Sequence, residues 1–150
     1  MNKSLSIAAT ATVLVFSTSS YANRSFDIAA GYGNQYGPNV GAQLSLASEF
    51  DRYYVSLGFG SGGWGYQRAI DEDTKHSLGI NQSVYSHFNL DKNDYYSLLT
   101  YNYHPDGFKS EGITLGFAIG EHRQKQYDRD GDLESEKKGP TLTLSIGYKF

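Results

Sequence analysis

The stretch PTLTLSIGYKF, residues Pro140–Phe150, alternates without interruption between two kinds of side chain. One face carries large apolar groups and the other carries small, mostly uncharged ones: Leu142, Leu144, Ile146, Tyr148 and Phe150 against Thr141, Thr143, Ser145, Gly147 and Lys149. A period of two is typical of a β-strand whose faces meet different environments. A face of Thr, Ser and Gly fits the narrow interior of a closed barrel. The stretch therefore predicts a barrel strand with its large apolar face toward lipid.

The same division recurs in six earlier segments of the chain. The seven segments are Ser25–Gly33, Val40–Phe50, Tyr53–Gly60, His76–Leu90, Tyr95–His104, Ile113–Gly120 and Pro140–Phe150. In the fifth segment we expect Tyr95, Leu99, Tyr101 and Tyr103 outward, with Ser97 as an exception. The predicted fold class is all-β: a closed antiparallel up-and-down transmembrane β-barrel of about eight strands. The eighth strand is expected within His104–Gly112, Glu121–Lys138 or Gly62–Thr74.

The first 22 residues have the layout of a secretory signal peptide. Lys3 gives a positive start, Leu5–Phe16 is apolar, and Ser20 and Ala22 are small residues at the positions that a signal peptidase recognises. An apolar run this short falls below the roughly 20 residues of a membrane-spanning helix. We therefore expect cleavage after Ala22, leaving one domain at 23–150.

Composition narrows the class of protein further. The chain has no cysteine, so stability must come from something other than disulfides. Without Lys3, twelve basic residues face sixteen acidic ones, a net charge of −4, which argues against nucleic acid as a partner. The 13 tyrosines, 8 phenylalanines and 17 glycines suit aromatic girdles around a barrel with small interior side chains.

The connections between the segments alternate in length. Glu49–Tyr53 and Asp91–Asp94 are short and are predicted on the periplasmic side, whereas Asn34–Asn39, Ser61–Thr74 and Gln124–Gly139 are longer and are predicted outside. Aromatic residues gather near segment ends, as an interfacial belt requires: Phe50, Tyr53, Phe88, Tyr95, Tyr148 and Phe150. A soluble barrel with its apolar face inward is the alternative. Its outer face of Gly, Ser, Ala and Asn would be too uncharged to keep it in solution.

The signal sequence, the short alternating strands and the closing Gly147–Phe150 resemble small outer-membrane barrels of the outer-membrane protein X and Ail type. Tyr148 and the terminal Phe150 resemble the assembly signal that the barrel assembly machinery recognises. The resemblance implies an eight-stranded barrel with protruding outer loops and a role in adhesion, envelope integrity or host-defence resistance. We expect a monomer in the cell outer membrane, in contact with outer-membrane lipid and lipopolysaccharide.

Two candidate chemical sites can be assembled from the sequence, and neither is favoured. His87 and Ser83 face inward one pleat apart and, with Glu49, could form a base–hydroxyl–acid set, but a space-filling interior histidine is the simpler interpretation. Alternating acids at Asp128, Asp130, Asp132 and Glu134 could bind calcium. Leu133 and Gly139 stand where a calcium loop of the EF-hand type needs Gly and Glu, so a solvated acidic loop is favoured. We expect no catalytic residue, cofactor or metal.

Two further expectations follow from the predicted closure and filling of the barrel. Asp27 and Lys149 point inward near the periplasmic ends of the first and last strands, so closure should bring them together as an ion pair. The glycines of Gly58–Gly65 lack the helix and the Lys-Ser/Thr pair of a phosphate-binding loop, and are expected to face a narrow interior. The predicted function is a non-enzymatic outer-membrane barrel. A lipid A- or phospholipid-modifying barrel enzyme is the alternative, and a narrow solute channel is a weaker one.

Overall fold

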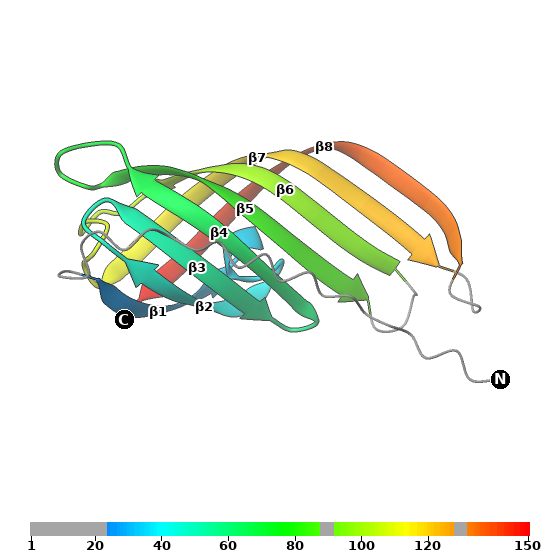
Figure 1. Ribbon diagram of the computed structural model, residues 1–150, viewed down its shortest axis with the longest axis horizontal. Coiled ribbons are helices and arrows are strands. Elements are labelled where there is room, and N and C mark those ends of the chain that lie inside the picture. Colours follow the sequence, from blue (N-terminus) through cyan, green and yellow to red (C-terminus); the bar gives the residue numbers. More distant parts are fainter. Residues whose placement is uncertain (1–23, 88–91, 128–131) are drawn as a thin grey trace.

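The computed structural model describes residues 24–87, 92–127 and 132–150 (Figure 1). The predicted signal peptide, residues 1–22, lies outside the described residues. Eight strands and one short 3₁₀ helix follow in order: β1 (Ser25–Tyr32), η2 (Asn34–Tyr36), β2 (Val40–Ala47), β3 (Asp51–Gly58), β4 (Ser61–Ala69), β5 (His76–His87), β6 (Lys92–Tyr103), β7 (Gly112–Tyr127) and β8 (Leu133–Lys149). Within these ranges, no helix has the length and apolar character needed to cross a membrane.

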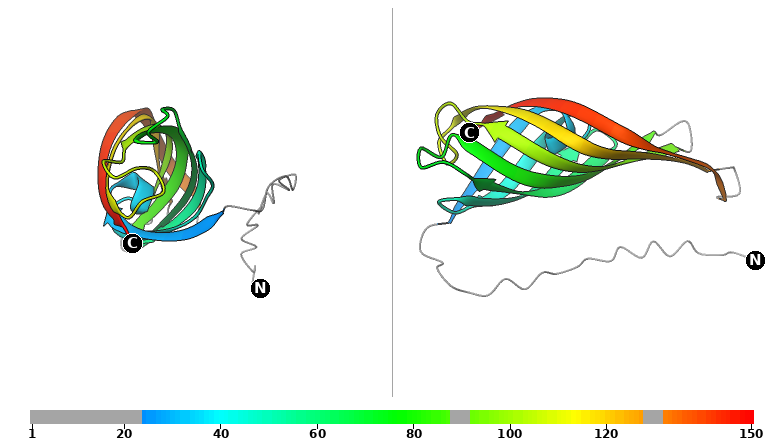
Figure 2. Two further views of the ribbon diagram at one scale, coloured as in Figure 1. Left: turned by 90° about the vertical axis from the view of Figure 1, so that its left-hand side faces the viewer. Right: turned by 90° about the horizontal axis from the view of Figure 1, so that it is seen from above.

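The eight strands close into one antiparallel up-and-down ring. Each strand pairs with the next along the chain, and β8 returns to pair with β1 through Ala29↔Lys149 and Tyr32↔Ile146. Viewed along its length, the chain forms a closed ring that is not evenly round (Figure 2, left). The predicted closed all-β architecture of eight antiparallel strands is confirmed.

The eighth strand is β4, which arises from the third of the three candidate stretches. It pairs along its whole length with β3 and β5, and its inward Gly65 lies beneath the Tyr54 ring, where a Cβ would come within 2.2 Å of the ring. A large side chain from β3 thus occupies the space that glycine leaves in β4. The expectation that Ser61–Thr74 forms a long outer loop is therefore wrong, because only residues 70–75 connect β4 to β5.

The outer surface of the ring carries the large apolar side chains. Every strand contributes, and one outward residue per strand shows exposed fractions between 38% and 67%: Ile28, Leu44, Val55, Trp64, Ile80, Leu99, Phe117 and Leu144. Three of the four outward residues predicted in β6, Tyr95, Leu99 and Tyr101, are exposed, whereas Tyr103 at the end of the strand is half-buried. The alternate residues are buried or half-buried. We call this ring of outward apolar residues the apolar belt.

The interior of the ring is small and polar. The largest of its fully buried side chains in the described chain are Phe108, Gln67, Asn81, Asn102, Ser56 and Ser77. The helix η2 turns back into this interior, where it is visible inside the ring in Figure 2 (left). The Gln35 amide donates to Asn102 Oδ1 at 2.6 Å and to Ser145 Oγ at 3.0 Å, and accepts from Gln67 Nε2 at 2.6 Å. Asn34–Tyr36 is therefore buried, and the expectation that Asn34–Asn39 is a surface loop is wrong for these residues.

The strand directions decide which connections share an end of the barrel. Because β1 begins and β8 ends at one end, which we call the terminal end, residues 48–50, 70–75 and 104–111 lie there too. The opposite, distal end holds residues 33–39 and 59–60 and the ends of β5–β6 and β7–β8. The short Asp91–Asp94 segment was expected beside the terminal end. That is wrong, because Lys92–Asp94 begins β6 at the distal end.

Four strands continue beyond the belt at the distal end (Figure 1). This distal extension comprises Gln82–His87, Lys92–Ser97, Glu121–Tyr127 and Leu133–Pro140. The expected Gln124–Gly139 loop is largely strand, since only 128–131 lies outside the described residues there. β8 pairs with β1 over Ile146–Lys149, so its distal part has β7 on one side and, on the other, an edge that pairs with no strand of the described chain.

Candidate functional site

The outward face of the distal extension is charged where the apolar belt ends. Glu121 accepts from Arg123 at 3.2 Å and from Lys138 at 2.8 Å, and Arg123 also lies 3.3 Å from Glu136. These residues come from β7 and β8, whose next outward residues toward the terminal end are Ile119 and Pro140, followed on β8 by Leu142. The outer surface therefore changes from apolar to charged between one outward residue and the next on each strand.

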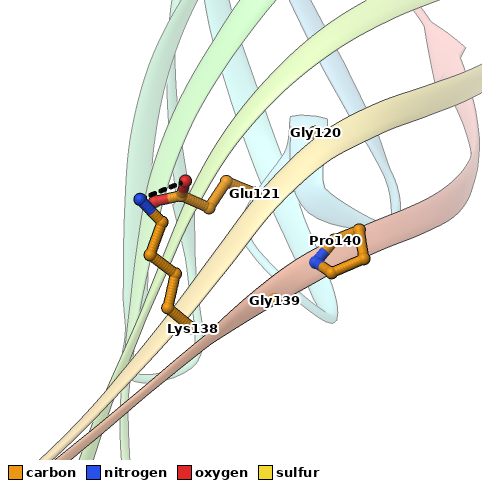
Figure 3. Close-up of a pocket in the computed structure, with 5 residues that line it drawn as sticks. All are labelled: Gly120, Glu121, Lys138, Gly139 and Pro140. Carbon is orange, nitrogen blue, oxygen red and sulfur yellow. Dashed lines mark ion pairs between the residues drawn. The ribbon is translucent and has the colours of Figure 1, made fainter.

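A hollow of about 490 Å³ lies at this boundary (Figure 3). Its lining is Gly120, Glu121, Lys138, Gly139 and Pro140, and the Lys138–Glu121 ion pair spans one side of it. Gly139 has open space where a Cβ would stand. The hollow is open and carries charges that already neutralise each other, so it has no feature of a catalytic pocket.

The inward face of the extension holds a cluster centred on one carboxylate. His87 Nε2 lies 2.7 Å from Asp94 Oδ2, while His122 Nε2 lies 2.9 Å and Gln124 Nε2 3.0 Å from Asp94 Oδ1. Tyr96 stacks on the His122 ring. Three adjacent strands, β5, β6 and β7, are thus joined through Asp94, and we call Asp94, His87, His122 and Gln124 the Asp94 cluster.

The environment of Asp94 favours its charged form. Burial opposes ionisation, but the hydrogen bonds from His87, His122 and Gln124 outweigh burial and hold the pKa of Asp94 below its ordinary value. The carboxylate is 9% exposed, whereas the two imidazoles are 29% and 32% exposed. The cluster therefore places a fixed negative charge between two groups that water can reach.

The predicted base–hydroxyl–acid set is not brought together. His87 and Ser83 do share the inner face, but His87 bonds Asp94, and Ser83 Oγ has no hydrogen-bond partner within the described chain. Glu49 is exposed in the connection between β2 and β3 at the terminal end, whereas His87 ends β5 at the distal end. The expectation that Glu49 faces inward near His87 is therefore wrong. Over residues 24–87, 92–127 and 132–150, no three acidic, histidine or cysteine side chains are arranged as a metal site.

Asp27 and Lys149 meet inside the terminal end of the barrel. Lys149 Nζ lies 3.7 Å from Asp27 Oδ2, and the two side chains are 5% and 11% exposed. Lys149 also donates to the Phe108 carbonyl at 3.0 Å, and Arg52 donates to the same carbonyl. The Arg52 guanidinium lies 4.1 Å from the centre of the Phe108 ring. The 104–111 connection thus folds Phe108 into the barrel mouth, where two cations and one carboxylate surround it.

The proposed assembly-signal residues lie on the outer surface at the same end. Tyr148 pairs with Ala30 of β1 and Ile113 of β7, and its ring lies 5.2 Å from that of Phe150, centre to centre. Both side chains are exposed, at 46% and 63%. They are therefore accessible from outside the ring at the seam where the barrel closes.

The acidic stretch is divided by the bounds of the described chain. Asp128 and Asp130 lie outside the described residues, while Glu134 belongs to β8 and accepts from Gln126 Nε2 at 2.9 Å. Glu134 is thus part of the ladder between β7 and β8, which differs from the loop position expected from the sequence.

Sequence reasoning missed the Asp94 cluster. Alternation alone places Asp94 and His122 on the inner face, but only the pairing Asp94↔Tyr85 and Tyr96↔His122 brings them beside His87.

No protein-family model, curated protein or solved structure matches this chain.

Proposed function

We propose that the protein is a small, non-enzymatic outer-membrane β-barrel whose distal extension stands outside the bilayer and recognises surface partners. The observation that carries the proposal is the apolar belt, which surrounds the whole closed ring. A belt of this kind would be insoluble in water but matches the outward apolar band of a transmembrane barrel. Exposed apolar area on this scale marks a surface made for lipid or for a partner.

The filled interior supports a barrel that neither conducts nor catalyses. The helix η2 fills the lumen from the distal end, and the Phe108 side chain fills it from the terminal end. An eight-stranded barrel has an interior just wide enough for side chains. These two insertions, linked to the wall through Gln35, Arg52 and Lys149, favour a structural anchor over a solute channel.

The distal extension supports a recognition role. Its β8 edge offers unpaired backbone groups, and an extended partner segment can add to such an edge as a further strand. The charged residues on the outward face of the distal extension make that surface suited to contact with water. Tyr148 and Phe150, at the closing seam, support assembly by the outer-membrane insertion machinery, in line with the resemblance to barrels of the outer-membrane protein X and Ail type.

Membrane insertion is tested by heat-modifiable gel migration of protein extracted from isolated outer membranes. A folded barrel resists unfolding by detergent until it is boiled, so two migrating species are expected. Protein that instead stays monomeric in detergent-free buffer after removal of membranes would contradict the proposal.

Orientation is tested by labelling single cysteines, because the chain has none of its own. Ser135→Cys in the distal extension should react with a membrane-impermeant maleimide on intact cells. Glu72→Cys, in the connection at the terminal end, should react only after the outer membrane is permeabilised. The reverse pattern would place the extension in the periplasm and remove the recognition role.

A further inference from the structure

The Asp94 cluster is the only place in the described chain where two histidines bind the same carboxylate. Each imidazole uses its Nε2 on a different oxygen of Asp94, and each comes from a different neighbouring strand. The cluster lies on the inner face of the extension, beyond the level at which β1 and β2 complete the ring. Backbone ladders hold this part of the sheet, no described strand lies opposite it, and the Asp94 cluster adds side-chain contacts across β5, β6 and β7.

Other charged and titratable groups face the same space from each strand. Lys92 of β6 pairs with His87, Lys137 of β8 pairs with Gln124, and Glu134 of β8 reaches Gln126. Tyr85 packs edge-on against His87, and Tyr96 stacks on His122. Asp94 thus sits among cationic or potentially cationic groups, with neutral aromatic rings covering the imidazoles.

We propose that the Asp94 cluster is an acid-strengthened clasp that orders the distal extension at mildly acidic pH. Histidine is the side chain whose charge ordinarily changes between pH 5 and 8. A neutral imidazole already gives the ionised Asp94 a hydrogen bond, and a protonated imidazole adds the attraction between opposite charges to that bond. The clasp tightens as the histidines gain charge, and it loosens only when Asp94 itself takes up a proton.

Lys92 and Lys137 place two further positive charges on the inner face that carries the two histidines. In combination with the proposed function, on which this regulatory role rests, an ordered extension at acidic pH would present the β8 edge as a rigid strand.

Hydrogen–deuterium exchange of the full-length protein in lipid vesicles tests the clasp. After correction for intrinsic rates, peptides from Gln82–His87, Lys92–Ser97 and Glu121–Tyr127 should exchange about threefold more slowly at pH 5.5 than at pH 7.5. Peptides from the apolar belt should show no such change. No slowing in the distal peptides of the wild-type protein would overturn the proposal.

Variants identify the groups responsible. The double variant His87→Gln and His122→Gln keeps a side-chain donor at each site but cannot gain a proton there, so its distal exchange should not depend on pH over this range. Asp94→Asn should likewise remove the response while the barrel still shows heat-modifiable migration. His76→Gln, at the terminal end, should keep the full response.

A response that survives in the double variant, or that is lost in His76→Gln, would show that other groups cause it and would refute the clasp. The exchange measurement does not depend on any partner. A negative exchange result would therefore refute the clasp without affecting the orientation shown by cysteine labelling. A reversed labelling pattern would refute the recognition role without affecting the exchange result.

Discussion

The same four strands, β5 to β8, build two regions with opposite physical character. In the ring their outward residues are Leu99, Ile119 and Leu142, and their inward residues meet a filled lumen. A few residues further along, the outward residues are Glu121, Arg123 and Lys138, and the inward face is half-exposed around Asp94. The comparison teaches that one ladder of backbone hydrogen bonds can pass between environments, while side chains decide how firmly each part is held.

The largest expected difference between the regions concerns the packed lumen. Phe108→Ala should lower the free energy of unfolding by about 3–5 kcal/mol, because a fully buried ring leaves a cavity that the rigid wall cannot fill. Urea unfolding in vesicles, followed by tryptophan fluorescence of Trp64, measures the loss. The adjacent exposed Lys109→Ala is the matched control, with a change within about 0.5 kcal/mol. Equal losses would show that 104–111 does not seal the barrel mouth.

The apolar belt should be the next most sensitive surface. Leu144→Arg places a cation in the middle of the apolar belt and should cost about 2–4 kcal/mol. Ser135→Arg lies on the same strand within the extension and should cost less than about 0.5 kcal/mol. The same vesicle unfolding experiment compares them. A tolerated arginine at Leu144 would contradict burial of the belt in lipid.

A pair of glycines in β8 compares the interiors of the two regions. A Cβ on Gly147 would come within 2.2 Å of the Tyr36 ring, so Gly147→Ala should destabilise by about 1–3 kcal/mol through overpacking. Gly139 has open space, and Gly139→Ala should be neutral or stabilise by less than about 1 kcal/mol. If adding Tyr36→Ala restores the stability lost in Gly147→Ala, the clash with Tyr36 of η2 is the cause. If the stability is not restored, another contact is responsible.

The smallest effect should be the loss of distal order in strong acid. Since the pKa of Asp94 lies below its ordinary value of 3.8, the folded extension binds fewer protons than an opened one near that pH. The contribution of Asp94 to stability is therefore fully present only well above pH 3.8 and is lost as the pH falls through the lowered folded pKa. Exchange of distal amides between pH 5 and pH 3 measures this. Asp94→Asn should flatten the profile, while belt amides should not respond in either protein.

The sequence predicts the wall of the barrel better than its contents or its ends. Alternation identifies seven strands because each has large residues on one face, as Leu142 to Phe150 show. It does not distinguish β4, where Gly62, Gly63 and Gly65 carry no side-chain signal and, at Gly65, the Tyr54 ring of β3 fills the space. The number of strands that precede a connection decides at which end of the barrel the connection lies. Because β4 is not recognised in the sequence, Asp91–Asp94 is predicted at the wrong end.

The candidate site depends on register, which a single sequence encodes weakly. Asp27 and Lys149 could be paired in advance, because closure makes the first and last strands neighbours wherever the other strands lie. The Asp94 cluster needs the exact offset of β5, β6 and β7, and polar residues on a half-exposed face do not fix that offset. The insertion of η2 was hidden for another reason. Asn34 and Gln35 look like loop residues, and only an interior rich in amides and hydroxyls makes their burial favourable.

Pro140 has a consequence for the unpaired edge of β8. Phe150 N donates to Ile28 of β1, and residues two apart along a strand point their backbone groups the same way, so the Pro140 nitrogen faces that open edge. Proline has no amide hydrogen to offer there. An extended partner segment of the kind proposed above could therefore pair along residues 133–139, about the length of one ordinary strand. The ladder of backbone hydrogen bonds would be interrupted at Pro140.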